Sequence, residues 1–329
     1  MRLNQFFNRL LTAGMALFPV FGKAPAGARL QRILRSTHYK DNHFENFVPT
    51  TVTLPGVSIF KMLREMRHRP ASAQPAHPIP SVHTDLRALP KDKVTIVWFG
   101  HSSYLLQIHQ TTILVDPVFS GHASPVPFLA KAYPGTGAYT AADMPEIDIL
   151  LLTHDHYDHL DYTTVRQLMP KTKHYCTSLG VGAHLESWGI APDKITELDW
   201  WESWSAEAGD ACGARGQSGD GPDGRITLTA TPARHFSGRS FKRAGTLWSA
   251  FVLKAAGYSL FLGGDSGYER HFKEIGERFG LYRRAVVMRP SAVRRQRRGT
   301  RHFQPVPRSS FGADRWRGSV PPNARWTRG

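Results

Sequence analysis

From residue 94 onward the chain carries short runs of apolar and β-branched residues, separated by Gly, Pro and Asp. Runs of this kind are typical of β-strands, and longer stretches with apolar residues at helical spacing are typical of helices. The pattern predicts strands over 94–99, 104–108, 112–115, 147–152, 174–177, 195–198, 226–230, 246–253 and 258–262, and helices over 162–169, 181–188 and 268–279. We therefore expect a main domain over residues 91–280.

The first 90 residues lack this regular pattern, and we expect them to form an N-terminal extension. Residues 69–90 are rich in proline and polar residues, which is typical of a linker or of a segment that wraps around a domain. Within the main domain, residues 209–224 hold six glycines and three aspartates, which predicts a flexible hairpin loop.

Two segments of the extension have features of membrane contact. The 12-residue apolar run over 10–21 is shorter than the roughly 20 residues that span a bilayer. It fits either a cleaved signal peptide or a helix that packs on the domain or lies on a surface. Residues 59–69 combine an apolar helical stripe with Lys and Arg, so they either pack on the domain or lie on anionic lipid. We expect a cytoplasmic protein, with inner-membrane association or export as alternatives.

Positive charge is concentrated at the C-terminal end. The formal net charge is +16, yet residues 281–329 contain 13 Arg, no Lys and one acid, so this tail alone carries +12. The rest of the chain is close to charge-balanced, and we expect no specific nucleic-acid binding. Residues 281–329 are either a non-native or disordered segment or a basic arm for nucleic acid or anionic lipid. The sequence does not determine the oligomeric state.

One motif in the sequence carries a specific chemistry. The stretch LLTHDHYDHLD over 151–161 places His154, His156, Asp158 and His159 at the end of an apolar run. If the chain leaves the strand still extended, the imidazoles of His154 and His156 point to the same side. Imidazole nitrogens and carboxylate oxygens are zinc ligands, and a strand end followed by a turn can present one ligand set to each of two metals.

The H-x-H-x-D-H arrangement resembles the signature of the metallo-β-lactamase superfamily, and the resemblance covers roughly residues 94–280. It implies an α+β fold, a four-layer αβ/βα sandwich, whose C-terminal part is atypical or truncated here. It also implies that His235 in TATPARHFSGR completes one zinc site with His154 and His156. Asp158 and His159 would hold a second zinc, and Asp265 in LFLGGDSGY would bridge the two.

Two residues of the first strands also match the family. By this resemblance, Asp116 in TTILVDP orients a ligand histidine through its other ring nitrogen, and His101 in WFGHSSYLLQI lines the metal pocket or is structural. GHSS, HYDHLD, ARHFSGR, GGDSGY and HFKEIGERFG together resemble the branch with N-acylphosphatidylethanolamine-hydrolysing phospholipase D and the ascorbate-phosphate lactonases of bacteria. HYKDNHFENFVPT over 38–50 favours the phospholipase.

The resemblance implies a hydrolase in which water activated between two zinc ions attacks phosphorus, while Asp158 acts as the catalytic residue that orients it. The partner would be a phospholipid or another phosphodiester, with possible peripheral membrane contact; the alternative is a lactonase acting on a sugar-phosphate lactone.

Members of the superfamily complete the second metal site with a last histidine, often in a His-Trp pair after a strand. After Gly280 the only histidine is His302, which is not followed by Trp and does not come after a strand-like run. The Arg-rich composition of residues 281–329 predicts a frameshift near codon 280. Besides the phospholipase and the lactonase, the third alternative is an impaired relative that lacks one metal ligand.

Overall fold

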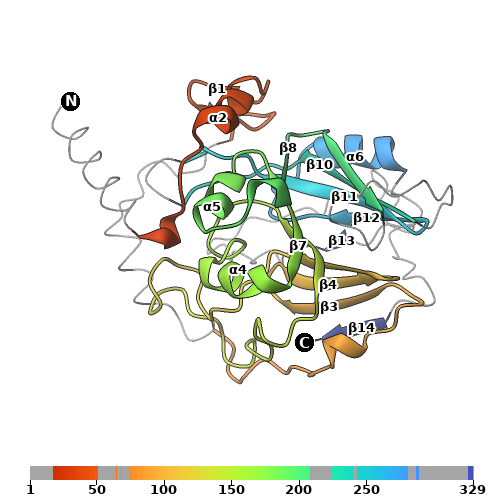
Figure 1. Ribbon diagram of the computed structural model, residues 1–329. Helices are drawn as coiled ribbons and strands as arrows, with labels where there is room; N and C mark the ends of the chain where they lie inside the picture. Colours follow the sequence, from red (N-terminus) through yellow and green to blue (C-terminus); the bar gives the residue numbers. More distant parts are fainter. Residues whose placement is uncertain are drawn as a thin grey trace, which may run out of the picture.

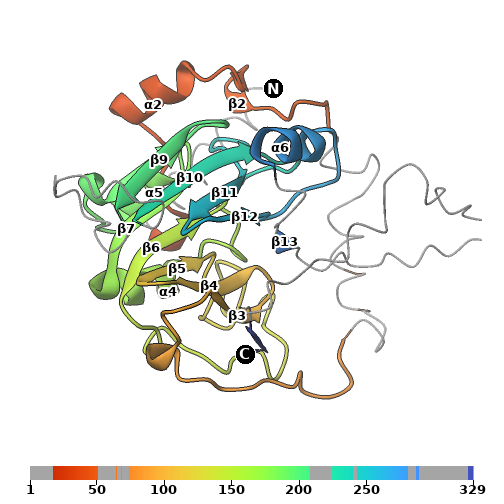
Figure 2. The same ribbon diagram turned by 90° about the vertical axis from the view of Figure 1, so that its right-hand side faces the viewer.

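Two β-sheets lie face to face in the computed structural model, with helices on the outer face of each (Figure 1, Figure 2). The structure describes residues 18–50, 64, 68, 74–207, 224–239 and 243–280, and the backbone of 287–288 and 325–328. The expectations for residues 1–17, for most of 59–69 and for the loop over 209–224 therefore lie outside the described residues.

The first sheet has seven strands in the order β14-β3-β4-β5-β6-β7-β8. β3, β4 and β5 pair antiparallel, whereas β5 to β8 run parallel. All six residues of β6 are buried, as is typical of a strand covered on both faces. The strands are β3 (Thr95–Gly100), β4 (Ser103–Ile108), β5 (Thr111–Val115), β6 (Ile147–Leu152), β7 (Thr172–Ser178), β8 (Ile195–Leu198) and β14 (Arg325–Arg328).

The second sheet has five strands in the order β13-β12-β11-β10-β9. β9 to β12 pair antiparallel, and β13 pairs parallel with β12. The strands are β9 (Ser203–Glu207), β10 (Arg225–Pro232), β11 (Ser249–Ala255), β12 (Tyr258–Leu262) and β13 (Val287–Met288).

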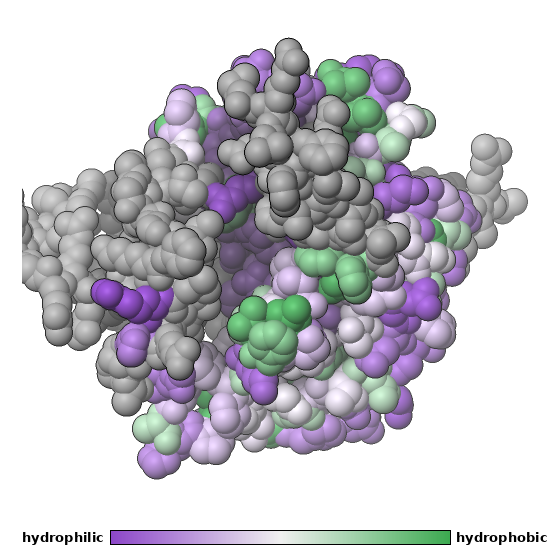
Figure 3. Space-filling view, turned by 90° about the vertical axis from the view of Figure 1, so that its left-hand side faces the viewer, coloured by the Kyte–Doolittle hydropathy of each residue, from purple (hydrophilic) through white to green (hydrophobic). Residues whose placement is uncertain are grey.

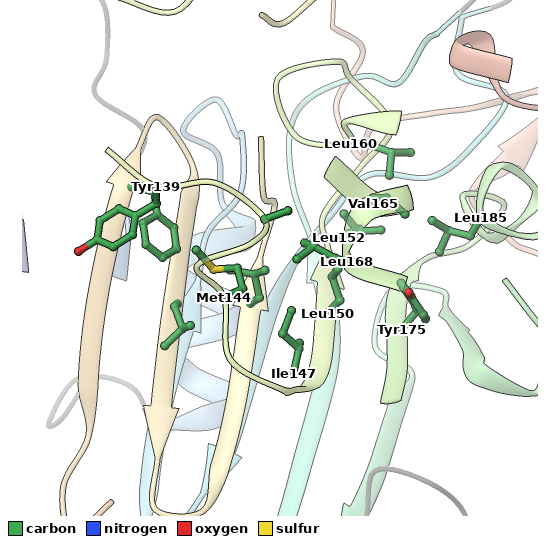
Figure 4. Packing of buried hydrophobic residues seen from close by; sticks show 14 of the residues in the cluster. Tyr139, Met144, Ile147, Leu150, Leu152, Leu160, Val165, Leu168, Tyr175 and Leu185 are labelled. Carbon is green, nitrogen blue, oxygen red and sulfur yellow. The ribbon is translucent and has the colours of Figure 1, made fainter. Parts of the chain in front are cut away.

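Successive side chains of each strand point to opposite faces of its sheet, so the buried residues form separate layers. Side chains on one face of the first sheet, such as Leu150 and Leu152, pack with Val165 of α4 (Tyr162–Leu168) and Leu185 of α5 (Gly182–Ser187) (Figure 4). The opposite face packs against the second sheet, whose outer face packs against Ile275 of α6 (His271–Phe279). The four layers confirm the predicted αβ/βα sandwich.

The described part of the N-terminal extension packs against the domain. It contains η1 (Pro19–Phe21), α2 (Gly27–Leu34), β1 (Tyr39–Lys40), β2 (His43–Phe44) and η3 (Leu86–Ala88). Ile33 and Phe44 are almost fully buried and share a cluster with Trp200 and Trp248. Two further short helical turns, η4 (Met169–Lys171) and η5 (Pro192–Lys194), lie within the main domain. None of the described helices has the length and apolar character needed to cross a bilayer.

Most predicted elements are present, and the differences have local causes. The strand predicted over 246–253 begins only at Ser249, because Thr246 bonds to Asp155 and the Leu247 amide bonds to the Leu179 carbonyl instead of to a neighbouring strand. β9 was not predicted, since SWSAE has too few apolar residues. The tail, where no strand was predicted, contributes the backbone of β13 and β14.

Candidate metal centre

The side chains singled out in the sequence follow the ends of strands at one end of the sandwich. His154, His156, Asp158 and His159 come after β6, which ends at Leu152. His235 follows β10, and Asp265 follows β12. Their donor atoms fall into two groups, within each of which all atoms lie within 4.8 Å of one another: His154, His156 and His235, and then His101, Asp158, His159 and Asp265.

The first group consists of three imidazoles. Nε2 of His154 lies 2.9 Å from Nδ1 of His156, and Nε2 of His235 lies 3.1 Å from the same Nδ1. The imidazoles of His154 and His156 therefore point to the same side, as predicted. Burial lowers the pKa of all three histidines, that of His235 to about 4, so the rings are neutral and keep lone pairs for a cation.

The second group mixes imidazole with carboxylate. Oδ2 of Asp265 lies 3.4 Å from Nε2 of His159 and 3.7 Å from Nε2 of His235, which places this carboxylate between the two groups. Asp265 was expected to bridge two metals, and its position is compatible with that role. Despite partial burial, the neighbouring histidines hold the pKa of Asp158 and of Asp265 below the usual range, so both carboxylates are ionised.

Asp116 holds two of the histidines. Its buried carboxylate accepts the backbone N–H and the hydroxyl of Thr153, at 2.8 and 2.7 Å, and lies 2.8 Å from Nδ1 of His159. The Thr153 hydroxyl lies 3.0 Å from Nδ1 of His154. Because Nδ1 of each ring is hydrogen-bonded in this network, Nε2 of each ring is the atom that faces the centre and can bind a metal. Asp116 thus lies beside Nδ1 of His159, and its expected role of orienting a ligand histidine stays a prediction.

His101 belongs to the second group of donor atoms, with Asp158, His159 and Asp265. Its Nε2 atom is 3.1 Å from Oδ2 of Asp158, and its side chain is half-exposed. The backbone of His101 has a positive φ of 44°, and its carbonyl accepts the indole N–H of Trp98. Such backbone conformations are uncommon for residues other than glycine and gather at functional sites.

Asp155 and Arg239 were not singled out from the sequence, yet they organise the loops that carry the ligands. The buried carboxylate of Asp155 accepts the amide of Gly238 and the hydroxyl of Thr246. Arg239, also buried, donates to the carbonyls of Asp155, Leu160 and Val20. These partners are dozens to hundreds of positions away, so no local spacing in the sequence signals them.

The donor set fits a metal centre. Nitrogen and oxygen donors from three imidazoles on one side, and from imidazole and carboxylate on the other, are the ligands of zinc and of other divalent transition metals. Within the part of the chain that the structure describes, Nε2 of His159 is buried without a well-formed hydrogen bond, and Oδ2 of Asp265 lies 3.4 Å away. A buried polar nitrogen with no partner is costly, and a metal ion at this position would satisfy it.

Comparison with known proteins agrees with this geometry. Residues 111–309 match the beta-lactamase superfamily domain. An uncharacterized protein of Mycobacterium tuberculosis is 34% identical over 250 residues, which are 75% of this chain and 63% of the relative. The N-acyl-phosphatidylethanolamine-hydrolyzing phospholipase D 1 of Caenorhabditis elegans is 28% identical over 198 residues, 58% of this chain and 52% of the relative.

A UPF0173 metal-dependent hydrolase of Anaeromyxobacter is 26% identical over 196 residues, 58% of this chain and 62% of the relative. The chain thus spans less than two thirds of the length of these curated relatives. The domain match extends beyond Gly280, where the resemblance in the sequence was expected to end. With the matched domain covering more than half of its length, the chain belongs to the beta-lactamase superfamily.

Proposed function

We propose that this protein is a hydrolase with two zinc ions that cleaves a phosphodiester bond in N-acylphosphatidylethanolamine-like phospholipids. The observation that carries the proposal is the pair of adjacent donor groups, with Asp265 between them. The name of the relative from Caenorhabditis elegans supports the choice of a phospholipid.

Each residue near the centre has a role in this proposal. His154, His156 and His235 hold one ion, and Asp158 and His159 hold the other, with Asp265 shared. Bound zinc supplies Lewis acidity and lowers the pKa of water toward neutrality.

The chain's own contribution is orientation. Asp116 fixes the ring of His159 directly and the ring of His154 through the Thr153 hydroxyl, and ionised Asp158 accepts a hydrogen bond from the attacking water. Water then adds to phosphorus, the P–O bond to the N-acylethanolamine breaks, and a proton lost by the water ends on the oxygen of the released N-acylethanolamine.

We extend the proposal to peripheral contact with a lipid surface. The loop after Asp116 projects as a hairpin between Gly121 and Ala132, and its tip exposes 71% of Phe128 and 49% of Leu129. Exposed apolar side chains next to a positive charge, here that of Lys131, favour an interface with lipid. A hydrophobic patch also borders a hydrophilic hollow on the face seen in Figure 3.

The first test measures metal and product together. The purified full-length chain should bind about two zinc ions, and it should release an N-acylethanolamine and leave phosphatidic acid from N-acylphosphatidylethanolamine in mixed micelles. His154→Ala should lose both properties. Opening of a sugar-phosphate lactone without phosphodiester cleavage would favour the lactonase, and bound zinc without any turnover would favour an impaired relative.

The lipid contact is tested separately. Phe128→Ser combined with Leu129→Ser should reduce sedimentation with phosphatidylglycerol vesicles while zinc content stays unchanged. The matched control is Phe18→Ser, because Phe18 is 62% exposed but lies outside this loop. Equal loss of sedimentation in the control would contradict a specific role of the hairpin tip.

A further inference from the structure

The side chain of Asn46 in the N-terminal segment makes a two-point contact with the backbone of His235, 189 positions away in the sequence. Its Nδ2 donates to the His235 carbonyl at 2.8 Å, and its Oδ1 accepts the His235 N–H at 3.0 Å. One amide group therefore satisfies both backbone polar groups of a residue whose imidazole faces the metal centre.

A third hydrogen bond fixes the amide itself. The indole N–H of Trp248 donates to Oδ1 of Asn46 at 3.1 Å and to the carbonyl of Ala233 at 3.0 Å. Since the two N–H groups can only donate and the His235 carbonyl can only accept, a single orientation of the amide satisfies all three partners. Trp248 is almost fully buried and packs with Phe44, two residues before Asn46.

His235 needs this support because it lies outside the sheet. β10 ends at Pro232, so the ladder of strand hydrogen bonds does not reach the His235 backbone. Among the described residues, its amide and carbonyl have no partner besides Asn46. The other histidines of the first group follow a central strand, β6, whose last residues are fully buried.

We propose that Asn46 is a positioning residue, which holds the backbone of His235 so that its imidazole stays directed at His154 and His156. The N-terminal segment would then be part of the metal centre, although it supplies no donor atom to it. This inference rests on the proposed role of His235 as a metal ligand. Groups that orient ligands in this way typically change metal affinity by about 10- to 100-fold when they are removed.

The test is a zinc titration of the full-length, metal-free protein in competition with a chromophoric chelator, with the unfolding temperature of each metal-free variant measured in parallel. We expect Asn46→Ala to weaken zinc binding by about 10- to 100-fold. Arg29→Met is the matched control, because it breaks the ion pairs of the same segment with Glu186 and Glu197 but touches no residue next to a donor. Arg29→Met should lower the unfolding temperature and leave zinc affinity near that of the native chain.

A second variant, Asn46→Asp, tests the inference independently if Asn46→Ala fails to fold. Asn46→Asp keeps the acceptor for the two N–H groups and replaces the donor to the His235 carbonyl. The added negative charge would by itself strengthen cation binding, so weaker zinc binding by this variant supports positioning. Native affinity in both variants would overturn the inference, as would an equal loss in Arg29→Met.

The titration distinguishes failure of the ligand role of His235 from failure of the positioning role of Asn46. If the native chain binds no zinc, or if His235→Ala binds it as tightly as the native chain, then His235 is not a ligand and both proposals fall. If His235→Ala loses affinity while Asn46→Ala and Asn46→Asp do not, only the role of Asn46 is overturned.

Discussion

The Oδ2 atom of Asp116 lies 2.8 Å from Nδ1 of His159, and neither side chain is exposed to solvent. Burial alone would lower the pKa of His159, but the charge and hydrogen bond of Asp116, together with Asp265, raise it to about 10. The 2.8 Å contact directs Nδ1–H at Asp116 and leaves Nε2 facing the centre, where a bound metal ion would replace the proton on that nitrogen.

Replacing Asp116 by Asn should weaken metal binding at the second donor group. The amide removes the negative charge that holds the His159 ring, and we expect metal affinity and activity to fall by about 10- to 100-fold. Asp148→Asn is the matched control, since Asp148 is also a buried carboxylate that accepts a backbone amide, that of Thr112. Equal losses in the two variants, measured by zinc titration, would contradict a specific role for Asp116.

His101 should act mainly by orienting Asp158. We expect His101→Ala to reduce activity by about 10-fold or more, and His101→Gln to retain more of it, because an amide N–H can replace the hydrogen bond of Nε2 to Asp158. Steady-state kinetics and zinc content of both variants check this. If Gln and Ala are equally damaging and each loses one zinc, His101 is instead a ligand of the second ion.

Gly264 allows the loop that carries Asp265 to approach β6 closely. Its φ is +53°, and a Cβ atom there would lie 3.0 Å from the side chain of Thr153. We expect Gly264→Ala to lower the free energy of unfolding by about 1–3 kcal/mol for the strained backbone, with a similar addition for the clash. Gly257→Ala is the control, because Gly257 also has a positive φ, +74°, with no atom within 4 Å. Urea unfolding that gives equal losses would contradict the close approach.

His174 should make the fold less stable in acid. Burial lowers its pKa from 6.5 to about 4, and its ring stacks on Trp204. Between these two pH values the unfolded chain binds more protons than the folded one, so the free energy of unfolding is fully retained above pH 6.5 and decreases as the pH falls toward 4. His174→Gln should reduce this decrease, as measured by urea unfolding at a series of pH values. Parallel pH profiles for the two proteins would contradict it.

Much of the fold follows from local pattern. β6, β8 and β12 have the predicted bounds. β6 and β12 are largely apolar runs, and the shorter β8 begins and ends with an apolar residue, Ile195 and Leu198. The histidines after β6 are adjacent in the sequence, so their convergence was also predictable. His235 and Asp265 needed the resemblance to the superfamily, since spacing alone does not show that the ends of β10 and β12 meet the end of β6.

The supporting residues could not be predicted in the same way. Asp155 sits inside the motif, but its partners Gly238 and Thr246 lie 83 and 91 positions away. Asn46 lies in an irregular segment with no apolar periodicity. Polar contacts of this kind leave no periodic signal, because one side chain meets one backbone group of a distant loop.

The separation of Asn46 from its partner also bears on how the chain is made. Translation proceeds at about 5–20 residues per second, so about 10–40 seconds pass between the synthesis of Asn46 and that of His235. During this interval the apolar side chains of Ile33 and Phe44 have no Trp248 to cover them, because that tryptophan is translated later still. A nascent chain paused before residue 248 is therefore expected to bind chaperones through the segment that contains Ile33 and Phe44.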